Sequence, residues 1–107
     1  MTRLKKGDNL LSCEGDLQSE AAVKRLQTEI LARIKAGVSN LILDMAGVSA
    51  ISAFGIQVLL GTANTLRAME ESLTLQNVSK SVMTLFHRLS ITGQFSIESE
   101  SQAGGQT

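Results

Sequence analysis

The stretch that decides the fold is residues 41–55, LILDMAGVSAISAFG, where an apolar run ends in a carboxylate and a short loop leads into a helix. Residues 40–45 form a nearly continuous apolar run, which is typical of a central strand covered on both faces. A helix that begins directly after such a strand presents backbone N–H groups that lack internal partners and carry partial positive charge. We therefore expect function at this junction, where a phosphate or an anionic group of a partner would be held.

On the N-terminal side of this stretch, the pattern predicts a hairpin followed by a helix. Residues 2–5 and 10–13 flank the turn-forming Gly7-Asp8-Asn9, which favours a short antiparallel hairpin. Ser19 is a suitable N-cap, and Gly37 supplies the stop of the helix between them. Four apolar residues spaced by three or four positions predict its buried face: Val23, Leu26, Ile30 and Ile34.

On the C-terminal side, the pattern predicts two further helices and two strands. Residues 54–71 are predicted to form the second helix of the chain. Its buried stripe comprises Val58, Leu59, Thr62, Leu66 and Met69. Residues 72–76 alternate as a strand does, and residues 95–97 add a last short one. Ser79 caps the other helix, whose sheet-facing positions are Val82, Leu85, Phe86 and Leu89.

Alternating strands and helices imply right-handed crossovers in an α/β fold. We expect a mixed β-sheet with an N-terminal antiparallel hairpin, parallel central strands and about three helices packed mainly on one face. The length of 107 residues fits one domain, over residues 1–98. Residues 99–107 are rich in Ser, Gln and Gly, which is typical of a disordered tail.

Composition narrows the functional classes. Ten basic and ten acidic side chains give a net charge of zero, which argues against a nucleic-acid binder. Cys13 is the only cysteine, so the chain has no internal disulfide and no multi-cysteine metal site, and a reducing cytoplasm is the expected location. No apolar stretch approaches the roughly 20 residues that cross a bilayer, so we expect no direct membrane insertion.

Two short motifs in the central stretch resemble the STAS domain of anti-sigma factor antagonists. That family shows an Asp-Leu-Ser-Gly-Val-like stretch followed by Ile-Asp-Ser-Ser-Gly, and this chain has DMAGV at 44–48 and ISAFG at 51–55. The order and length of the segments extend the resemblance from about Thr2 to Ile97. The resemblance implies the STAS fold, with action by protein binding and without a cofactor, a metal or catalysis.

The chain departs from the family at the phosphorylation site. The family's phosphoacceptor is the Ser directly after the Asp of the second motif, and Ala53 stands at the matching position. A methyl group accepts no phosphoryl group, so the usual switch is absent there. Ser52 replaces the family's Asp and Phe54 its second Ser, and these accompanying changes favour natural divergence over an engineered Ser-to-Ala change.

The resemblance also implies a partner and a surface. An antagonist of this family docks its motif loop and second helix on an anti-sigma factor, a GHKL-type serine-kinase-like protein. The corresponding partner-binding residues of this chain are Ser49, Ala50, Ser52, Ala53, Phe54, Gly55 and Gln57. The sequence is silent on the oligomeric state.

Several of these residues have two interpretations. Ser52 is either the N-cap of the second helix or a displaced phosphoacceptor, and Ser49 is either a turn hydroxyl or a second candidate for phosphorylation. Phe54 is an aromatic anchor for a partner if it is exposed and a core residue if it points inward. Asp16 and Asp44 are expected to order the loop by accepting backbone N–H bonds.

Two other functions are open besides anti-sigma antagonism. One is an accessory subunit of an ABC lipid-transport complex, and the other is a scaffold subunit of a stress-signalling complex that is phosphorylated at Ser52. Enzymatic activity is not expected, because His87 is the only histidine and no nucleophile or metal ligand lies at a recognisable spacing from it.

Overall fold

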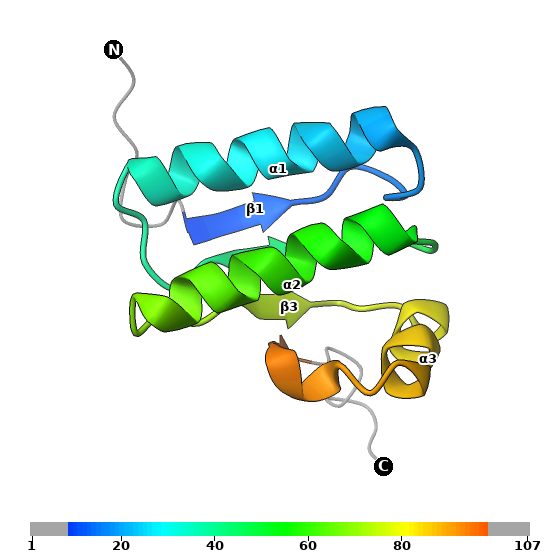
Figure 1. Ribbon diagram of the computed structural model, residues 1–107. Coiled ribbons are helices and arrows are strands. Elements are labelled where there is room, and N and C mark those ends of the chain that lie inside the picture. Colours follow the sequence, from blue (N-terminus) through cyan, green and yellow to red (C-terminus); the bar gives the residue numbers. More distant parts are fainter. Residues whose placement is uncertain (1–8, 99–107) are drawn as a thin grey trace.

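The computed structural model describes residues 9–98, which form one four-stranded parallel sheet with three α-helices (Figure 1). The strands lie in the order β1-β2-β3-β4. Their bounds are Leu10–Ser12, Ile42–Asp44, Thr74–Gln76 and Ser96–Glu98. Their central residues, Leu11, Leu43, Leu75 and Ile97, face one another in register. All four strands therefore end at the same edge of the sheet, and the loops that follow them gather there.

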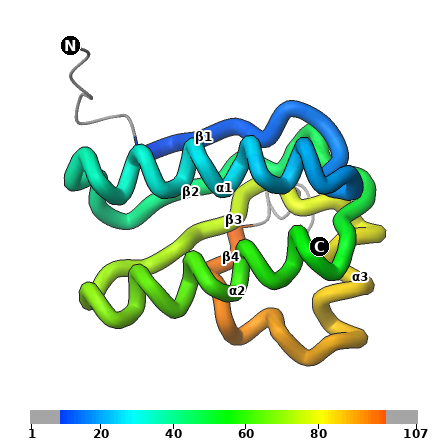
Figure 2. Tube along the Cα trace, turned by 45° about the horizontal axis from the view of Figure 1, so that its top comes forward, coloured from blue at the N-terminus to red at the C-terminus, as the bar shows by residue number. Residues whose placement is uncertain are grey.

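Two long helices, α1 (Glu20–Lys35) and α2 (Ala53–Ala68), lie side by side over one face of the sheet (Figures 1 and 2). The shorter α3 (Lys80–Arg88) lies beyond the carboxyl ends of the strands, and a 3-10 turn, η2 (Thr92–Gln94), leads from it into β4. Each α-helix begins after a serine whose hydroxyl accepts a hydrogen bond from a backbone N–H of the first turn. These caps satisfy donors that would otherwise have no partner in the helix.

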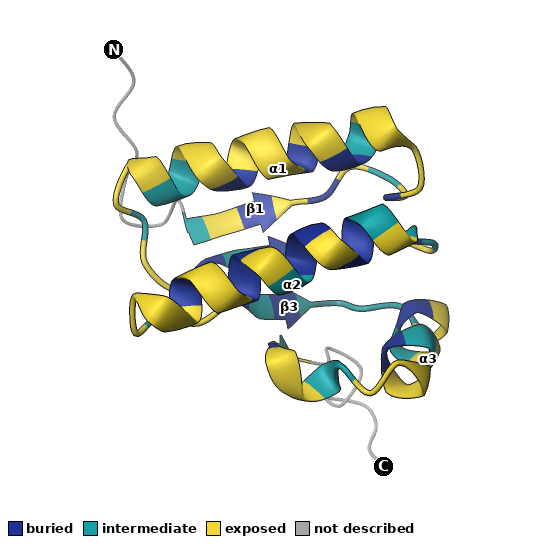
Figure 3. Ribbon diagram, viewed as in Figure 1, coloured by how far each residue is buried: buried dark blue, intermediate teal, exposed yellow. Residues whose placement is uncertain are grey.

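The core lies between the sheet and the inner faces of the helices (Figure 3). Leu43 and Leu75 of the central strands are fully buried, as are Leu59 and Leu66 of α2. Phe86 of α3 is also fully buried, and its ring centroid lies 5.6 Å from that of Phe95. On the helical side, α2 thus packs over the central strands, and α3 packs at the end of the sheet.

The structure confirms the α/β class, the three helices and the serine caps at Ser19, Ser52 and Ser79. β1, the first described strand, pairs with β2 in parallel, so the predicted parallel arrangement of the central strands includes β1. The predicted partner strand at residues 2–5 lies outside the described residues, and so does the predicted tail at 99–107.

The prediction of one helix end and of two buried residues was wrong. α2 ends at Ala68 and not at Glu71, because Met69 is its C-cap and Glu70 adopts a positive φ of 62°. Met69 is consequently 46% exposed, and Leu89, the C-cap of α3, is 47% exposed, although both were expected to be buried. Both residues are the C-caps of their helices, and the spacing rule does not by itself bury a residue at the end of a helix.

None of the helices within residues 9–98 is both long and apolar enough to span a bilayer.

Candidate functional site

The loop between β2 and α2, residues 45–52 and hereafter the motif loop, is fixed on one side by Asp16. One carboxylate oxygen, Oδ1, accepts three hydrogen bonds: from the backbone N–H of Ser49 at 2.7 Å, from the Ser49 hydroxyl at 2.9 Å and from the backbone N–H of Ala50 at 3.2 Å. The Ser49 N–H bond is the main reason that the pKa of Asp16 lies below its usual value, and the Ser49 hydroxyl adds to it. Asp16 is therefore ionised when it holds the loop.

Asp44 acts at the start of the same loop. Its Oδ1 accepts hydrogen bonds from the backbone N–H of Ala46 and from the Asn77 side-chain amide, both at 3.0 Å. Asn77 directly follows β3 and has a positive φ of 57°, a conformation that asparagine tolerates better than most residues. The carboxylate thus joins the ends of two neighbouring strands.

Two further contacts tie the motif loop to its surroundings. Leu17 pairs with Ile51 in an isolated parallel bridge, with Leu17 N–H donating to Ala50 O at 3.0 Å and Ser52 N–H donating to Leu17 O at 2.8 Å. From α3, the Ser81 hydroxyl donates to Ser49 O at 3.0 Å. The loop is therefore held from three sides although much of it faces solvent.

At the end of the motif loop, the Ser52 hydroxyl accepts a hydrogen bond from the backbone N–H of Gly55 at 3.1 Å. Ser52 is half-buried, and its cap interaction stabilises the start of α2. The Ser49 hydroxyl already donates a hydrogen bond to the Asp16 carboxylate. A phosphoryl group on Ser49 would remove this bond and place the negative phosphate beside the negative carboxylate. The two candidate phosphoacceptors thus both have structural tasks in the unmodified chain.

The seven expected partner-binding residues do not share one environment. Ser49, Ala53 and Gln57 are exposed, whereas Ala50, Ser52 and Phe54 are half-buried. These six, hereafter the docking patch, contain no charged side chain. Phe54 packs against the core cluster and also keeps part of its ring at the surface, so it combines its two interpretations.

Gly55 differs from the six, because it is buried. A Cβ at this position would lie 2.8 Å from Ile51 Cγ1 and 3.1 Å from Leu17 O. Gly55 therefore corrects the expectation for that residue: it allows α2 to start close beneath the motif loop and offers no surface to a partner.

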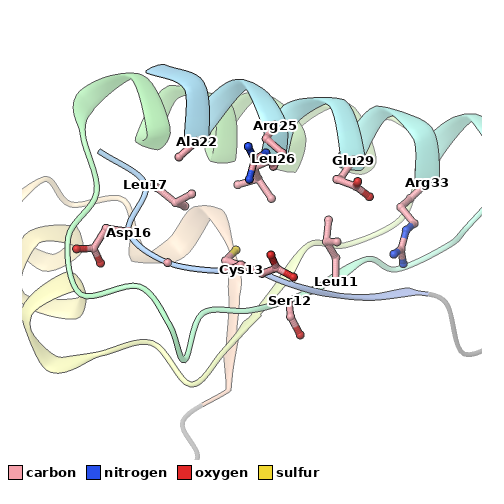
Figure 4. A pocket seen from close by; sticks show the side chains of 12 residues that line it. Leu11, Ser12, Cys13, Asp16, Leu17, Ala22, Arg25, Leu26, Glu29 and Arg33 are labelled. Carbon is pink, nitrogen blue, oxygen red and sulfur yellow. The ribbon is translucent and has the colours of Figure 1, made fainter. Parts of the chain in front are cut away.

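A hollow of about 360 Å³ lies next to Asp16, between β1 and α1 (Figure 4). Its wall includes Cys13 and side chains of α1, among them Arg33, whose guanidinium donates to Leu10 O at 3.2 Å. Burial, and secondarily the charge of Asp44, raises the pKa of the Cys13 thiol to about 11, so the thiol is protonated and unreactive at neutral pH. Over residues 9–98, no group of three or more His, Cys, Asp or Glu side chains is arranged to hold a metal ion.

Sequence reasoning missed two residues of the site, Asn77 and Ser81. Asn77 directly follows β3, and the carboxyl ends of adjacent parallel strands meet at one edge, so its position beside Asp44 was a usable signal. Ser81 carried no comparable signal, because the placement of α3 against the motif loop depends on the tertiary fold. His87, in contrast, is exposed on α3.

The fold and the site together define the class of protein: a small parallel α/β domain with a serine-capped strand-to-helix loop at the carboxyl edge of its sheet. Residues 2–103 match the STAS domain family model, and the chain belongs to this family. Among curated proteins, no sequence matches the chain.

Solved structures share the fold. The unphosphorylated form of the anti-sigma factor antagonist SpoIIAA is 20% identical, with a TM-score of 0.67 over 89% of this chain and 82% of that one. An anti-sigma factor antagonist-like protein from Thermotoga maritima gives a TM-score of 0.75 at 12% identity, over 94% of this chain and 88% of that one. A sulfate transporter family protein from Wolinella succinogenes gives 0.65 at 18% identity, over 89% and 81%. At these identities the likeness establishes the fold.

Proposed function

We propose that this STAS domain is an anti-sigma factor antagonist-like regulator that binds a GHKL-type anti-sigma factor kinase through the docking patch. The observation that carries the proposal is the presentation of this patch: an uncharged surface at the start of α2, held in one conformation by Asp16, Asp44 and Ser81. A preorganised surface binds with a smaller loss of conformational entropy than a mobile loop does. The proposed role is binding without turnover, in the cytoplasm.

The structural neighbour SpoIIAA is described in an unphosphorylated and a phosphorylated form. In the proposed function, this chain differs in its control, because Ala53 occupies the position of the family's phosphoacceptor and carries no hydroxyl. The docking patch then stays in the binding-competent state unless another residue is modified. The chain acts in this proposal as a constitutive antagonist, or as one that is controlled by the supply of its partner.

The test is a charge placed on the docking patch. Ala53 and Ala21 are both exposed alanines in the first turn of a 16-residue helix that a serine caps, so Ala53→Glu and Ala21→Glu are matched variants. A glutamate at either position suits the positive end of its helix and leaves the fold intact. The chain is first used as bait in extract of the native cell, bound proteins are identified by mass spectrometry, and the affinity of the recovered kinase is measured by calorimetry.

We expect Ala53→Glu to weaken kinase binding by roughly tenfold or more, about 1.4 kcal/mol, and Ala21→Glu to leave it unchanged. Equal affinity of the two variants would place the interface elsewhere and contradict the proposal. Recovery of an ATPase subunit of a transport complex, without a kinase-like protein, would favour the accessory-subunit function instead.

A second experiment tests the lost switch. The recovered kinase and ATP are incubated with the wild-type chain and with the Ala53→Ser variant, and the products are digested and sequenced by mass spectrometry. We expect phosphate at position 53 of the variant only. Phosphate on Ser52 of the wild-type chain would support the scaffold alternative with a relocated site.

A further inference from the structure

A second surface lies on the outer side of the helical layer. A groove of about 380 Å³ separates α1 from α2, and none of the ten residues that line it is charged, although 19% of the chain is. Leu31 of α1 stands at its rim with 50% of its surface exposed, and Ile34 and Phe54 are half-buried in it. The outer faces of both helices are turned to the viewer in Figure 3, where no other described element covers them. The groove thus leaves apolar surface in contact with solvent.

Gly61 is the second observation on this groove. It lies in the middle of α2, is exposed, and has a helical backbone that requires no glycine. A Cβ added there would meet nothing within 4 Å. Glycine is among the least favourable residues inside a helix, and nothing in the described fold requires it here. Gly55, in the same helix, differs from Gly61, because atoms of the chain itself occupy the space that a Cβ at position 55 would need. Neither helix propensity nor packing within the described chain therefore accounts for a glycine at position 61.

We propose that this groove is the contact between two copies of the chain. The same face carries a projecting side chain, Leu31, and a recess at Gly61, so a twofold axis would place the leucine of each copy beside the glycine of the other. Such an isologous contact needs a surface that is complementary to itself. The uncharged lining brings no like charges together, and the formal net charge of zero adds no overall repulsion between copies.

The proposed dimer has a consequence for the docking patch. Phe54 and Gln57 belong both to the patch and to the lining of the groove. Self-association would cover them, and a partner that needs them would compete with the second copy. The dimer is measured on the purified chain alone, so its failure leaves the kinase proposal standing, and failure of kinase binding leaves the dimer standing.

Sedimentation equilibrium of the full chain tests the contact at loading concentrations from about 5 μM to about 500 μM, the range over which a weak and reversible dimer forms and dissociates. We expect the wild-type chain to shift reversibly from monomer to dimer over this range. Gly61→Gln fills the recess with a better helix former whose Cβ meets no atom of its own chain, and it should raise the dissociation constant at least tenfold. Leu31→Gln removes the projecting apolar side chain and should act in the same direction.

The matched control is Ala68→Gln, which introduces the same side chain at an exposed position of the same helix outside the groove, and it should dimerise as the wild type does. Thermal unfolding of each variant shows that the fold is kept, and Leu31→Gln provides the independent test if Gly61→Gln fails to fold. A wild-type chain that stays monomeric at every concentration would overturn the proposal. So would a dimer that neither groove variant weakens.

Discussion

The motif loop and the layer of α1 and α2 over the sheet are held by different kinds of interaction. The loop is fixed by a few hydrogen bonds, three of which end on one oxygen of Asp16, and much of its surface is exposed. The helical layer is fixed by fully buried apolar side chains such as Leu59 and Leu66. Burial contributes most of the free energy of folding, whereas hydrogen bonds at the surface determine local conformation. A change in the loop should therefore alter recognition with little effect on folding, and a change in the buried side chains of the layer should do the reverse.

The largest effect is expected for Leu59→Ala, which removes a fully buried side chain from α2. The lost apolar burial and the remaining cavity should lower the free energy of unfolding by about 3 kcal/mol. Urea unfolding followed by circular dichroism measures this loss. A decrease below about 1 kcal/mol would show that the layer is loosely packed, and the contrast with the loop would then be invalid.

The two glycines of α2 give the next prediction. Gly55→Ala places a Cβ 2.8 Å from Ile51 Cγ1 and 3.1 Å from a backbone oxygen, and this overpacking should cost about 1–3 kcal/mol. Gly61→Ala meets no atom and should instead raise the free energy of unfolding by about 0.5–1 kcal/mol, through helix propensity. The two variants are compared by urea unfolding under the same conditions. Equal effects would contradict the difference in packing between these two positions of α2.

The same contrast explains which parts of the molecule the sequence could predict. The buried faces of the helices followed from spacing, and the caps at Ser19, Ser52 and Ser79 followed from residue type beside an apolar pattern. Spacing failed at the helix ends, because Met69 and Leu89 keep the apolar spacing yet are exposed at the C-caps.

The site shows the limit more clearly. The polar residues of the motif loop could be named from the junction alone, but Ser81 contacts Ser49 only because α3 folds back to the carboxyl edge of the sheet. Gly55 looked like part of the exposed motif, and its burial depends on Leu17, which is 38 positions away in the sequence and pairs with Ile51. Local pattern thus predicts the composition of the loop, whereas the contacts that hold it come from distant segments.

A smaller effect is expected for Ser52→Ala, which removes the N-cap of α2 at the boundary between the two regions. The Gly55 N–H loses its acceptor, and the free energy of unfolding should fall by about 1 kcal/mol. Ser19→Ala removes the equivalent cap of α1, where the serine accepts from the Ala22 N–H at 3.1 Å, and should cost a similar amount. In the kinase-binding assay, only Ser52→Ala should reduce affinity. A loss of affinity in both variants would show that binding follows overall stability and not the docking patch.

Asp16→Asn is expected to cause the smallest change in the free energy of global unfolding and the largest change in the local order of the motif loop. Hydrogen exchange of the Ser49 and Ala50 amides should become faster, because the amide oxygen is a weaker acceptor than the carboxylate that now receives both N–H groups.

The pKa of Asp16 is lowered in the folded chain, so the unfolded chain binds the proton more readily. Its contribution to stability is therefore present above the ordinary carboxyl pKa and is lost as the pH falls below about 4. Urea unfolding between pH 7 and pH 3 should therefore show that Asp16→Asn loses less stability on acidification than the wild type does. Unchanged amide exchange in Asp16→Asn would mean that Ser81 and the Leu17 bridge suffice to hold the loop, and the carboxylate would then serve recognition and not loop order.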